Sequence, residues 1–107
     1  MRRAAIYVQP SFWEALGLAL QEAMFCGCAC IGSRAGGIPE LIRENETGLL
    51  FEPGNSAQLA GALEQLIANE KRREQLGLAA ARSILELGMT AKAMAQRLLE
   101  LYESIQR

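Results

Sequence analysis

Two glutamates, Glu14 and Glu22, stand on either side of Gly17 and are the residues best suited to hold a polar ligand. They follow a short apolar run that ends at Pro10, which predicts a strand, a loop and then a helix that opens near Gly17. The first turn of a helix offers unpaired N–H groups, and a glycine there lets a phosphate approach the backbone. Carboxylates repel phosphate but accept hydrogen bonds from sugar or ribose hydroxyls. Taken alone, the spacing favours a simpler interpretation, a strand-to-helix turn with two solvated glutamates.

The elements that must position these residues alternate between strands and helices. Such alternation predicts an α/β fold with three layers, Rossmann-like, around a short parallel sheet of about three strands. A complete doubly wound nucleotide-binding domain has about six strands, so the pattern looks like one half of such a domain. The predicted strands are Ala4–Val8, Ala29–Gly32 and Leu49–Phe51, and the predicted helices are Leu16–Phe25, Pro39–Ile42, one capped by Asn55, Lys71–Leu87 and Ala91–Ile105.

Several local signals support these helices. Gly27 suits the C-terminal cap of the first long helix. Asn55 with Gln58 three residues later is a capping-box pattern. Two apolar stripes at helical spacing predict the buried faces of the next two helices, Leu59, Leu63, Leu66 and Ile67 in one and Leu76, Ala80, Ile84 and Leu87 in the other.

The composition excludes several kinds of site. The 107 residues fit a single domain, 1–107, and contain neither His nor Asp, so a Ser-His-Asp triad, a His-ligated metal and an Asp-x-Asp motif are absent from this sequence. The net charge of −1 gives no sign of a nucleic-acid partner. Cys26, Cys28 and Cys30 could suggest a metal site, but an apolar setting and the lack of a fourth ligand favour buried free thiols. No stretch is long enough to span a membrane or form a signal-peptide core, so we expect a cytoplasmic chain.

Three ordered motifs resemble those of a known family, the retaining glycosyltransferases of family 4, also called group 1, which have the GT-B fold. The segment Pro10–Ala23 is similar to the family pattern Pro-Ser-x-x-Glu-x-x-Gly-Leu-x-x-x-Glu-Ala. Gly36–Glu40 matches its Gly-Gly-x-Pro-Glu turn, and Thr47–Gly54 matches its Thr-Gly-Leu-Leu-x-x-Pro-Gly segment. The resemblance covers essentially the whole chain and implies the second half of the C-terminal, donor-binding domain.

The resemblance assigns roles to individual residues. Glu14 would contact hydroxyls of the donor sugar, and Glu22 would hold the ribose hydroxyls of the nucleotide. Gly17 and Leu18 would offer backbone N–H groups to the sugar and diphosphate of a nucleotide-sugar donor, without a metal or other cofactor. None of these residues is expected to be a catalytic nucleophile.

Other residues near the motifs are weaker candidates. Gly36 and Gly37 either form a donor-site loop or serve only as a turn. Glu40 suits the first turn of its short helix for structural reasons. Arg34 could reach a phosphate but fits a solvated loop position better, and the aromatic pair Phe12 and Trp13 either lines the site or packs the loop.

The chain lacks parts that the family uses. The family's cationic pair that grips the diphosphate and its N-terminal acceptor domain lie upstream of the matched segment. We therefore expect the isolated chain to transfer no sugar, and whether it acts as an enzyme depends on the missing acceptor domain or a partner subunit. The alternative is a non-catalytic nucleotide-binding or assembly module, truncated or separately encoded.

A sheet cut in half also leaves an open edge, which we expect at Ala4–Val8. Pairing through that edge, or through apolar surface left uncovered, predicts a homodimer or larger assembly unless the last two helices fold over it. The sequence does not identify the base, the sugar or the acceptor.

Overall fold

A computed structural model describes residues 5–10 and 14–87 of the chain, together with the single positions 92, 95, 96, 99, 100 and 103. Its centre is a parallel sheet in the order β1-β2-β3. The strands are β1 (Ile6–Gln9), β2 (Ala29–Ser33) and β3 (Leu49–Phe51). Ile6 pairs with Ala29, and Ile31 pairs with Leu49. The predicted α/β fold with a short parallel sheet is confirmed.

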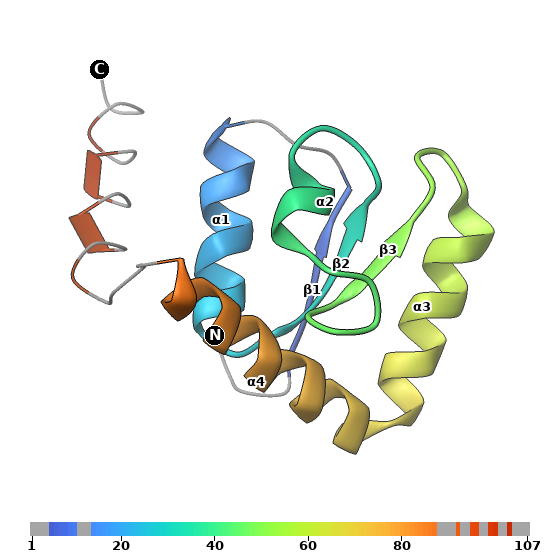
Figure 1. Ribbon diagram of the computed structural model, residues 1–107. Helices are drawn as coiled ribbons and strands as arrows, with labels where there is room; N and C mark the ends of the chain where they lie inside the picture. The colour runs from blue at the N-terminus through green and yellow to red at the C-terminus, as the bar shows by residue number, and fades with distance from the viewer. Residues whose placement is uncertain are drawn as a thin grey trace.

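Helices cover both faces of this sheet and its lower end (Figure 1). One face carries α1 (Glu14–Phe25) and the short α2 (Ile38–Leu41), and the other carries α3 (Ser56–Ala68). The last long helix of the described part, α4 (Glu70–Glu86), crosses beneath the sheet from α3 to α1. It therefore closes the end of the sheet where the strands begin, and no helix of the described residues crosses the end where they finish.

Side chains of β2 divide the interior into two apolar clusters. All five residues of this strand are buried, as expected for the central strand of a parallel sheet. Cys28 and Cys30 belong to the cluster beneath α1 and α2, whereas Ala29 and Ile31 belong to the cluster beneath α3. Helix α4 contributes to both, with Ala80 and Ile84 on the first side and Leu76 on the second.

The turn from α1 into β2 is held by local hydrogen bonds and by α4. Gly27 has a φ of 82°, and the N–H groups of Gly27 and Cys28 donate to the carbonyls of Met24 and Ala23 at 3.0 Å. This is the Schellman arrangement that ends helices at a left-handed glycine. Helix α4 presses Gly77 so closely on this turn that an added Cβ would lie 2.0 Å from the Gly27 carbonyl oxygen.

Several sequence predictions need correction. Leu59 and Leu63 are half-buried and Leu66 is buried, but Ile67 is 66% exposed because it lies on the solvent side of α3. In α4, Leu76, Ala80 and Ile84 are buried as predicted, whereas Leu87 follows the end of the helix and is exposed. The predicted helix Ala91–Ile105 lies outside the continuous described segments.

The predicted capping box at α3 forms on one side only. The Gln58 N–H donates to Asn55 Oδ1 at 3.0 Å, as predicted for an N-cap. The Gln58 side chain does not bond back to Asn55, whose own N–H donates to the Glu52 carbonyl. Instead, Gln58 Oε1 accepts from the Glu52 N–H at 2.6 Å. Gln58 therefore caps the strand edge next to it.

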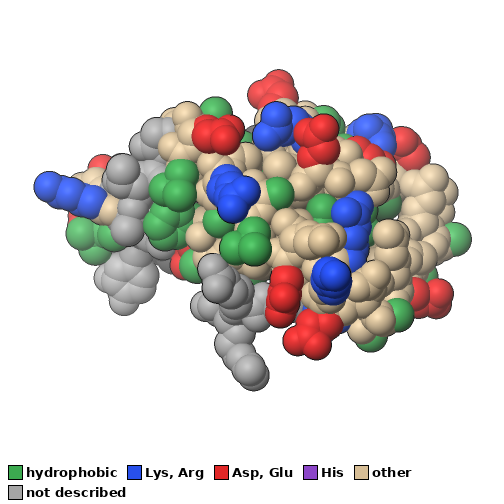
Figure 2. Space-filling model, turned by 60° about the horizontal axis from the view of Figure 1, so that its bottom comes forward, with side chains coloured by type: hydrophobic (Ala, Val, Ile, Leu, Met, Phe, Trp, Pro, Cys, Tyr) green, Lys and Arg blue, Asp and Glu red, His purple; other side chains and the backbone are tan. Residues whose placement is uncertain are grey.

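The surface around α4 is mixed in charge. Figure 2 brings this face forward and shows acidic and basic side chains interspersed, with neither sign forming a continuous patch. None of the helices among the described residues is both long enough and apolar enough to cross a membrane.

Candidate functional site

The uncovered end of the sheet collects the residues that the sequence singled out. Strand β1 ends at Gln9 and α1 begins at Glu14, while β2 ends at Ser33 shortly before Gly36 and Gly37. Because the strands are parallel, these connections lie at the same, carboxyl edge of the sheet (Figure 1). This is the edge at which doubly wound sheets bind ligands. Phe12 and Trp13 lie outside the described residues.

Helix α1 begins two residues earlier than the sequence predicted, at Glu14 rather than Leu16. The unpaired N–H groups of a helix are those of its first turn. The N–H of Gly17 is therefore the last of these unpaired groups, and the N–H of Leu18 comes one residue after them. The side chains of residues 14–18 lie outside what the structure describes, so the donor contacts of Glu14, Gly17 and Leu18 stay predictions.

Glu22 lies further along α1, next to the strand at the edge of the sheet. Eight residues of helix separate it from Glu14, a rise of about 12 Å. Its half-buried side chain is close enough to Tyr7 of β1 to affect that phenol: burial raises the pKa of Tyr7, and the neighbouring Cys30 and Glu22 raise it further. The Tyr7 hydroxyl donates to Gln9 Oε1 at 2.7 Å. The two acids of the motif thus lie along one helix beside β1, one at the carboxyl edge and one beside the body of the strand.

The loop after β2 is a tight turn. Gly36 has a φ of 54°, a left-handed conformation that favours glycine, and Gly37 precedes α2 with a φ of −87°. The Ile38 N–H donates to the Ala35 carbonyl at 3.2 Å. This geometry explains the pair as a turn, and a ligand contact by Gly36 or Gly37 stays a prediction. Glu40 is exposed in the first turn of α2, in keeping with a structural role.

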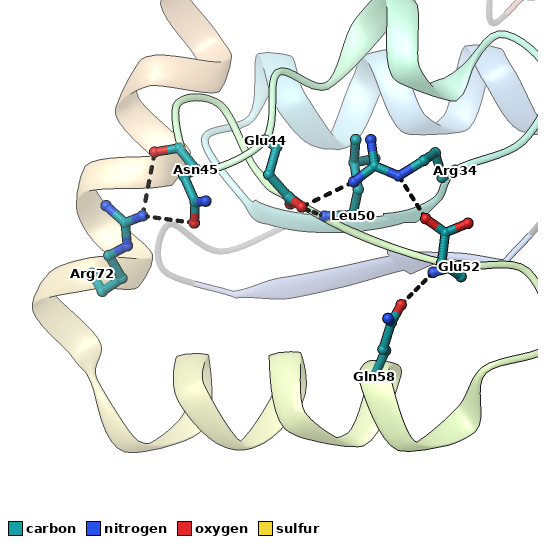
Figure 3. Close-up of polar contacts among 7 residues, drawn as sticks. All are labelled: Arg34, Glu44, Asn45, Leu50, Glu52, Gln58 and Arg72. Atoms are coloured by element: carbon teal, nitrogen blue, oxygen red, sulfur yellow. Dashed lines mark hydrogen bonds and ion pairs between the residues drawn. The ribbon is translucent and has the colours of Figure 1, made fainter.

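Arg34 links the loops that follow β2 and β3, as Figure 3 shows. Its Nε lies 3.0 Å from Glu52 Oε1, and its Nη2 lies 3.1 Å from Glu44 Oε1. The side chain is 44% exposed, so water screens both ion pairs. The guanidinium is therefore paired with two carboxylates and is not a free solvated group, and a phosphate contact by Arg34 stays an untested alternative.

A pocket of about 330 Å³ lies beside this network, on the far side of the sheet from β1. Its walls come from β3, the loop before it and one face of α3. Polar residues outnumber apolar ones in its lining, which consists of Arg34, Glu44, Asn45, Leu49, Leu50, Glu52, Gln58, Gly61, Ala62 and Gln65. Glu14 and Glu22 lie on the helix beside β1, so this pocket is separate from the motif.

The three cysteines behave as core residues. Cys28 and Cys30 are fully buried, Cys26 is half-buried, and all three are free thiols. Burial raises the pKa of Cys28, and it raises that of Cys30 strongly, which keeps both thiols neutral. Among the residues that the structure describes, no three His, Cys, Asp or Glu side chains gather in a way that could hold a metal ion.

The sequence interpretation missed two features of this end of the molecule. Ser33 at the end of β2 is 1% exposed, and its Oγ has no hydrogen-bond partner within the described part of the chain. Glu44 and Glu52 bind Arg34 from positions distant in sequence. Neither feature has a local sequence pattern; both arise because parallel strand ends meet at one edge.

Comparison with known proteins gives a consistent result. Residues 1–83 match the model of the family described as Glycosyl transferases group 1. The N-acetyl-alpha-D-glucosaminyl L-malate synthase of Bacillus anthracis is 40% identical over 92 residues, which cover 86% of this chain and 23% of that protein. The alpha-maltose-1-phosphate synthase of Mycolicibacterium smegmatis is 34% identical over 108 residues, covering 95% of this chain and 28% of that protein. The chain thus spans about a quarter of the length of these curated relatives.

Solved structures agree in fold. A sucrose-phosphate synthase from Thermosynechococcus elongatus superposes with a TM-score of 0.73 and 32% identity, covering 94% of this chain and 25% of that one. The C-terminal domain of a glycosyl transferase group 1 family protein from Francisella tularensis gives a TM-score of 0.68 and 37% identity. That match covers 76% of this chain and 42% of the other, so the matched C-terminal domain extends well beyond the shared part.

Proposed function

Because this chain belongs to the group 1 glycosyltransferases, we propose that it is part of a donor-binding domain, the second half, that holds a nucleotide-diphosphate sugar for retaining sugar transfer. The observation that carries the proposal is the placement of the Glu14–Glu22 motif. Its helix begins at the carboxyl edge of a parallel sheet and runs beside β1. Ligand sites in doubly wound folds lie at this edge.

Each part of the motif suits one part of the donor. The first turn of α1 provides N–H groups and the positive end of the helix dipole for the diphosphate. Glu14 at that turn accepts hydrogen bonds from the transferred sugar, and Glu22, two turns further, accepts from the ribose hydroxyls. In this proposal the leaving diphosphate is stabilised by backbone dipoles and by cations that lie outside this segment, in place of a metal, and the lack of an Asp-x-Asp motif in this sequence fits it.

The relatives support sugar transfer as the general activity and leave the substrates open. The matched proteins are named for products as different as N-acetylglucosaminyl malate, maltose 1-phosphate and sucrose phosphate. The chain spans about a quarter of these relatives. In this proposal it provides one wall of the donor site, and transfer itself requires an acceptor-binding part outside this segment, either in the same protein or in a partner subunit.

The test is a binding comparison that isolates the ribose contact. We expect UDP, GDP or ADP to bind the chain with a Kd in the high micromolar to millimolar range, about −4 to −6 kcal/mol. Glu22→Ala should weaken the best of these nucleotides about tenfold or more, because it removes a charged hydrogen-bond acceptor worth roughly 1.5–3 kcal/mol. Isothermal titration calorimetry or ligand-detected NMR measures both proteins.

Two controls make the comparison specific. Glu64→Ala removes the same charge from an exposed position on α3 and should leave the affinity unchanged. Pyrophosphate, which has no ribose, should bind the original chain and the Glu22→Ala variant equally. If Glu22→Ala weakens pyrophosphate as much as the nucleotide, Glu22 does not hold ribose and the assignment is wrong.

A further inference from the structure

The pocket beside β3 has a volume of about 330 Å³ and is lined by residues between Arg34 and Gln65. One wall is β3 with the loop before it, and the other is the face of α3 that carries Gln58, Gly61 and Gln65. Pockets for small ligands measure roughly 300–1,000 Å³, so this one suits a ligand with a single ring. It lies at the opposite edge of the sheet from β1, and a ligand here is independent of the proposed donor site.

Gly61 keeps the α3 wall of this pocket open. A Cβ added at Gly61 would meet nothing within 4 Å, whereas one added at Gly77 would strike the backbone of Gly27. No neighbouring atom therefore requires a glycine at position 61, although alanine is the more stable residue inside a helix. The missing side chain leaves the helix backbone accessible from the pocket, which allows a ligand to approach it closely.

Several side chains around the pocket have polar atoms that the described contacts do not use. Arg34 binds Glu44 through Nη2 and Glu52 through Nε, which leaves Nη1 unused. Gln58 accepts from the Glu52 N–H through Oε1, and its amide N–H groups remain unused. Gln65 makes no side-chain hydrogen bond within the described part of the chain. Figure 3 shows Glu52 between Arg34 and Gln58, with one carboxylate oxygen left over.

The charges around the pocket favour a neutral ligand. Two carboxylates, Glu44 and Glu52, outnumber the one guanidinium of Arg34, which opposes an anion in this pocket. A cation would compete with Arg34, because Glu44 already accepts from both Arg34 and the Leu50 N–H. Hydroxyl groups donate and accept, so they can bond the unused N–H groups and the remaining Glu52 oxygen together. A small ring with several hydroxyls and no charge matches this set.

We propose that this pocket binds a neutral sugar ring. Its hydroxyls accept from Arg34 Nη1 and from the amide groups of Gln58 and Gln65. Another hydroxyl donates to the free oxygen of Glu52, and the ring lies against the open helix surface at Gly61. These groups are exposed, so water competes for each hydrogen bond and the Kd is in the millimolar range. A free monosaccharide and the end of a longer glycan offer the same chemistry.

An NMR titration of the labelled chain tests this site. The probes are methyl α-D-glucopyranoside, methyl α-D-mannopyranoside, methyl β-D-galactopyranoside and maltotriose, each at tens of millimolar. At least one should cause saturable shifts in the amides of Gln58, Gly61 and Gln65 while leaving the first turn of α1 unchanged. Equal affinity for the matching monosaccharide and maltotriose assigns the site to a free sugar, and tighter binding of maltotriose assigns it to a glycan. No saturable shift from any probe, or shifts at α1 instead, overturns the proposal.

The charge of the ligand is tested with D-glucuronate. This sugar acid has a hydroxylated ring like that of the glucoside and adds a negative charge. It should bind at least several-fold more weakly than the best neutral probe, because Glu44 and Glu52 outweigh Arg34. Glucuronate that binds as tightly as the neutral probes overturns the assignment to an uncharged ligand.

A matched pair of helix variants tests the role of Gly61. Gly61→Leu fills the open wall and should weaken the best probe at least tenfold. Ala60→Leu adds the same side chain to α3 at an exposed neighbour outside the pocket lining, and should leave the affinity unchanged. Equal affinities in the two variants overturn the proposal. If Gly61→Leu does not fold by circular dichroism, Gln65→Ala decides: it should weaken the probe several-fold, and an unchanged affinity overturns the site.

Discussion

At the scale of single residues, the buried thiols of Cys28, just before β2, and of Cys30, within it, make the stability of the fold depend on pH. Cys30 is fully buried beneath α1, and burial strongly raises its pKa above the ordinary thiol value of 9.0. A thiolate can therefore form only when the chain unfolds. A group whose folded pKa is raised stabilises the fold fully below its unfolded pKa, and this contribution is lost as the pH rises above that value.

We therefore predict that the free energy of unfolding falls between pH 8 and pH 10. Each buried thiol contributes a slope that approaches about 1.4 kcal/mol per pH unit once its unfolded form ionises. Urea unfolding at both pH values measures this fall in the free energy of unfolding. The Cys30→Ala variant should show a smaller fall, because it lacks the contribution of the Cys30 thiol. Between pH 6 and pH 8 the thiol contribution should be flat in both proteins. An equal alkaline fall in both would show that Cys30 ionises freely in the folded chain.

Residue types and spacing predicted Glu22 inside the helix that follows β1, as observed, but they left Glu14 in the loop before that helix, whereas Glu14 is the first residue of α1. They could not predict the partners of Arg34. Glu44 and Glu52 are 10 and 18 residues away, and they reach Arg34 only because β2 and β3 are neighbours. The sequence likewise could not predict that Ser33 Oγ would be buried without a hydrogen-bond partner among the described residues, because a serine at a strand end is usually solvated.

At the scale of elements, tertiary packing determined helix boundaries and buried faces that local sequence propensity did not predict. The strand Leu49–Phe51 was predicted with its observed bounds because polar turns flank a short apolar run. The start of α1 was predicted two residues late because Gly17 resembled a helix opening. Ile67 fits the apolar stripe of α3 but faces solvent, since α3 contacts the sheet along a narrower line. The crossing of α4 beneath the sheet has no local sequence signal.

Two helical glycines provide a matched test of that crossing. Gly77→Ala would place a Cβ 2.0 Å from the Gly27 carbonyl oxygen, and backbone atoms on both sides resist movement. We predict a destabilisation of about 1–3 kcal/mol, as for other overpacked sites. Gly61→Ala in α3 meets nothing within 4 Å and should stabilise the chain by about 0.5–1 kcal/mol through helix propensity. Chemical denaturation of both variants measures the difference, and a neutral or stabilising Gly77→Ala would refute the α4 contact.

At the scale of the whole molecule, the family and the fold class followed from the sequence, whereas the homodimer expected through the Ala4–Val8 edge stays a prediction. The motifs are ordered along the chain and each falls at a strand end or helix start, so the family resemblance and the α/β pattern agree. The side-chain caps on the N–H groups of Leu50 and Glu52 could not be predicted, because they depend on which N–H groups of β3 point away from β2 and therefore on the register of the strands.

The central claim is that the carboxyl edge beside α1 holds the donor nucleotide, and an NMR titration that maps the bound surface tests it most directly. UDP, GDP and ADP are added in turn to the isotopically labelled chain. We predict that at least one of them changes the amide chemical shifts of the first turn of α1, of residues 34–37 and of the residues around Glu22. Pyrophosphate should shift the first turn but not the surroundings of Glu22. Shifts confined to the pocket beyond β3, at Gln58 and Gln65, or no shifts at millimolar nucleotide, would contradict the account.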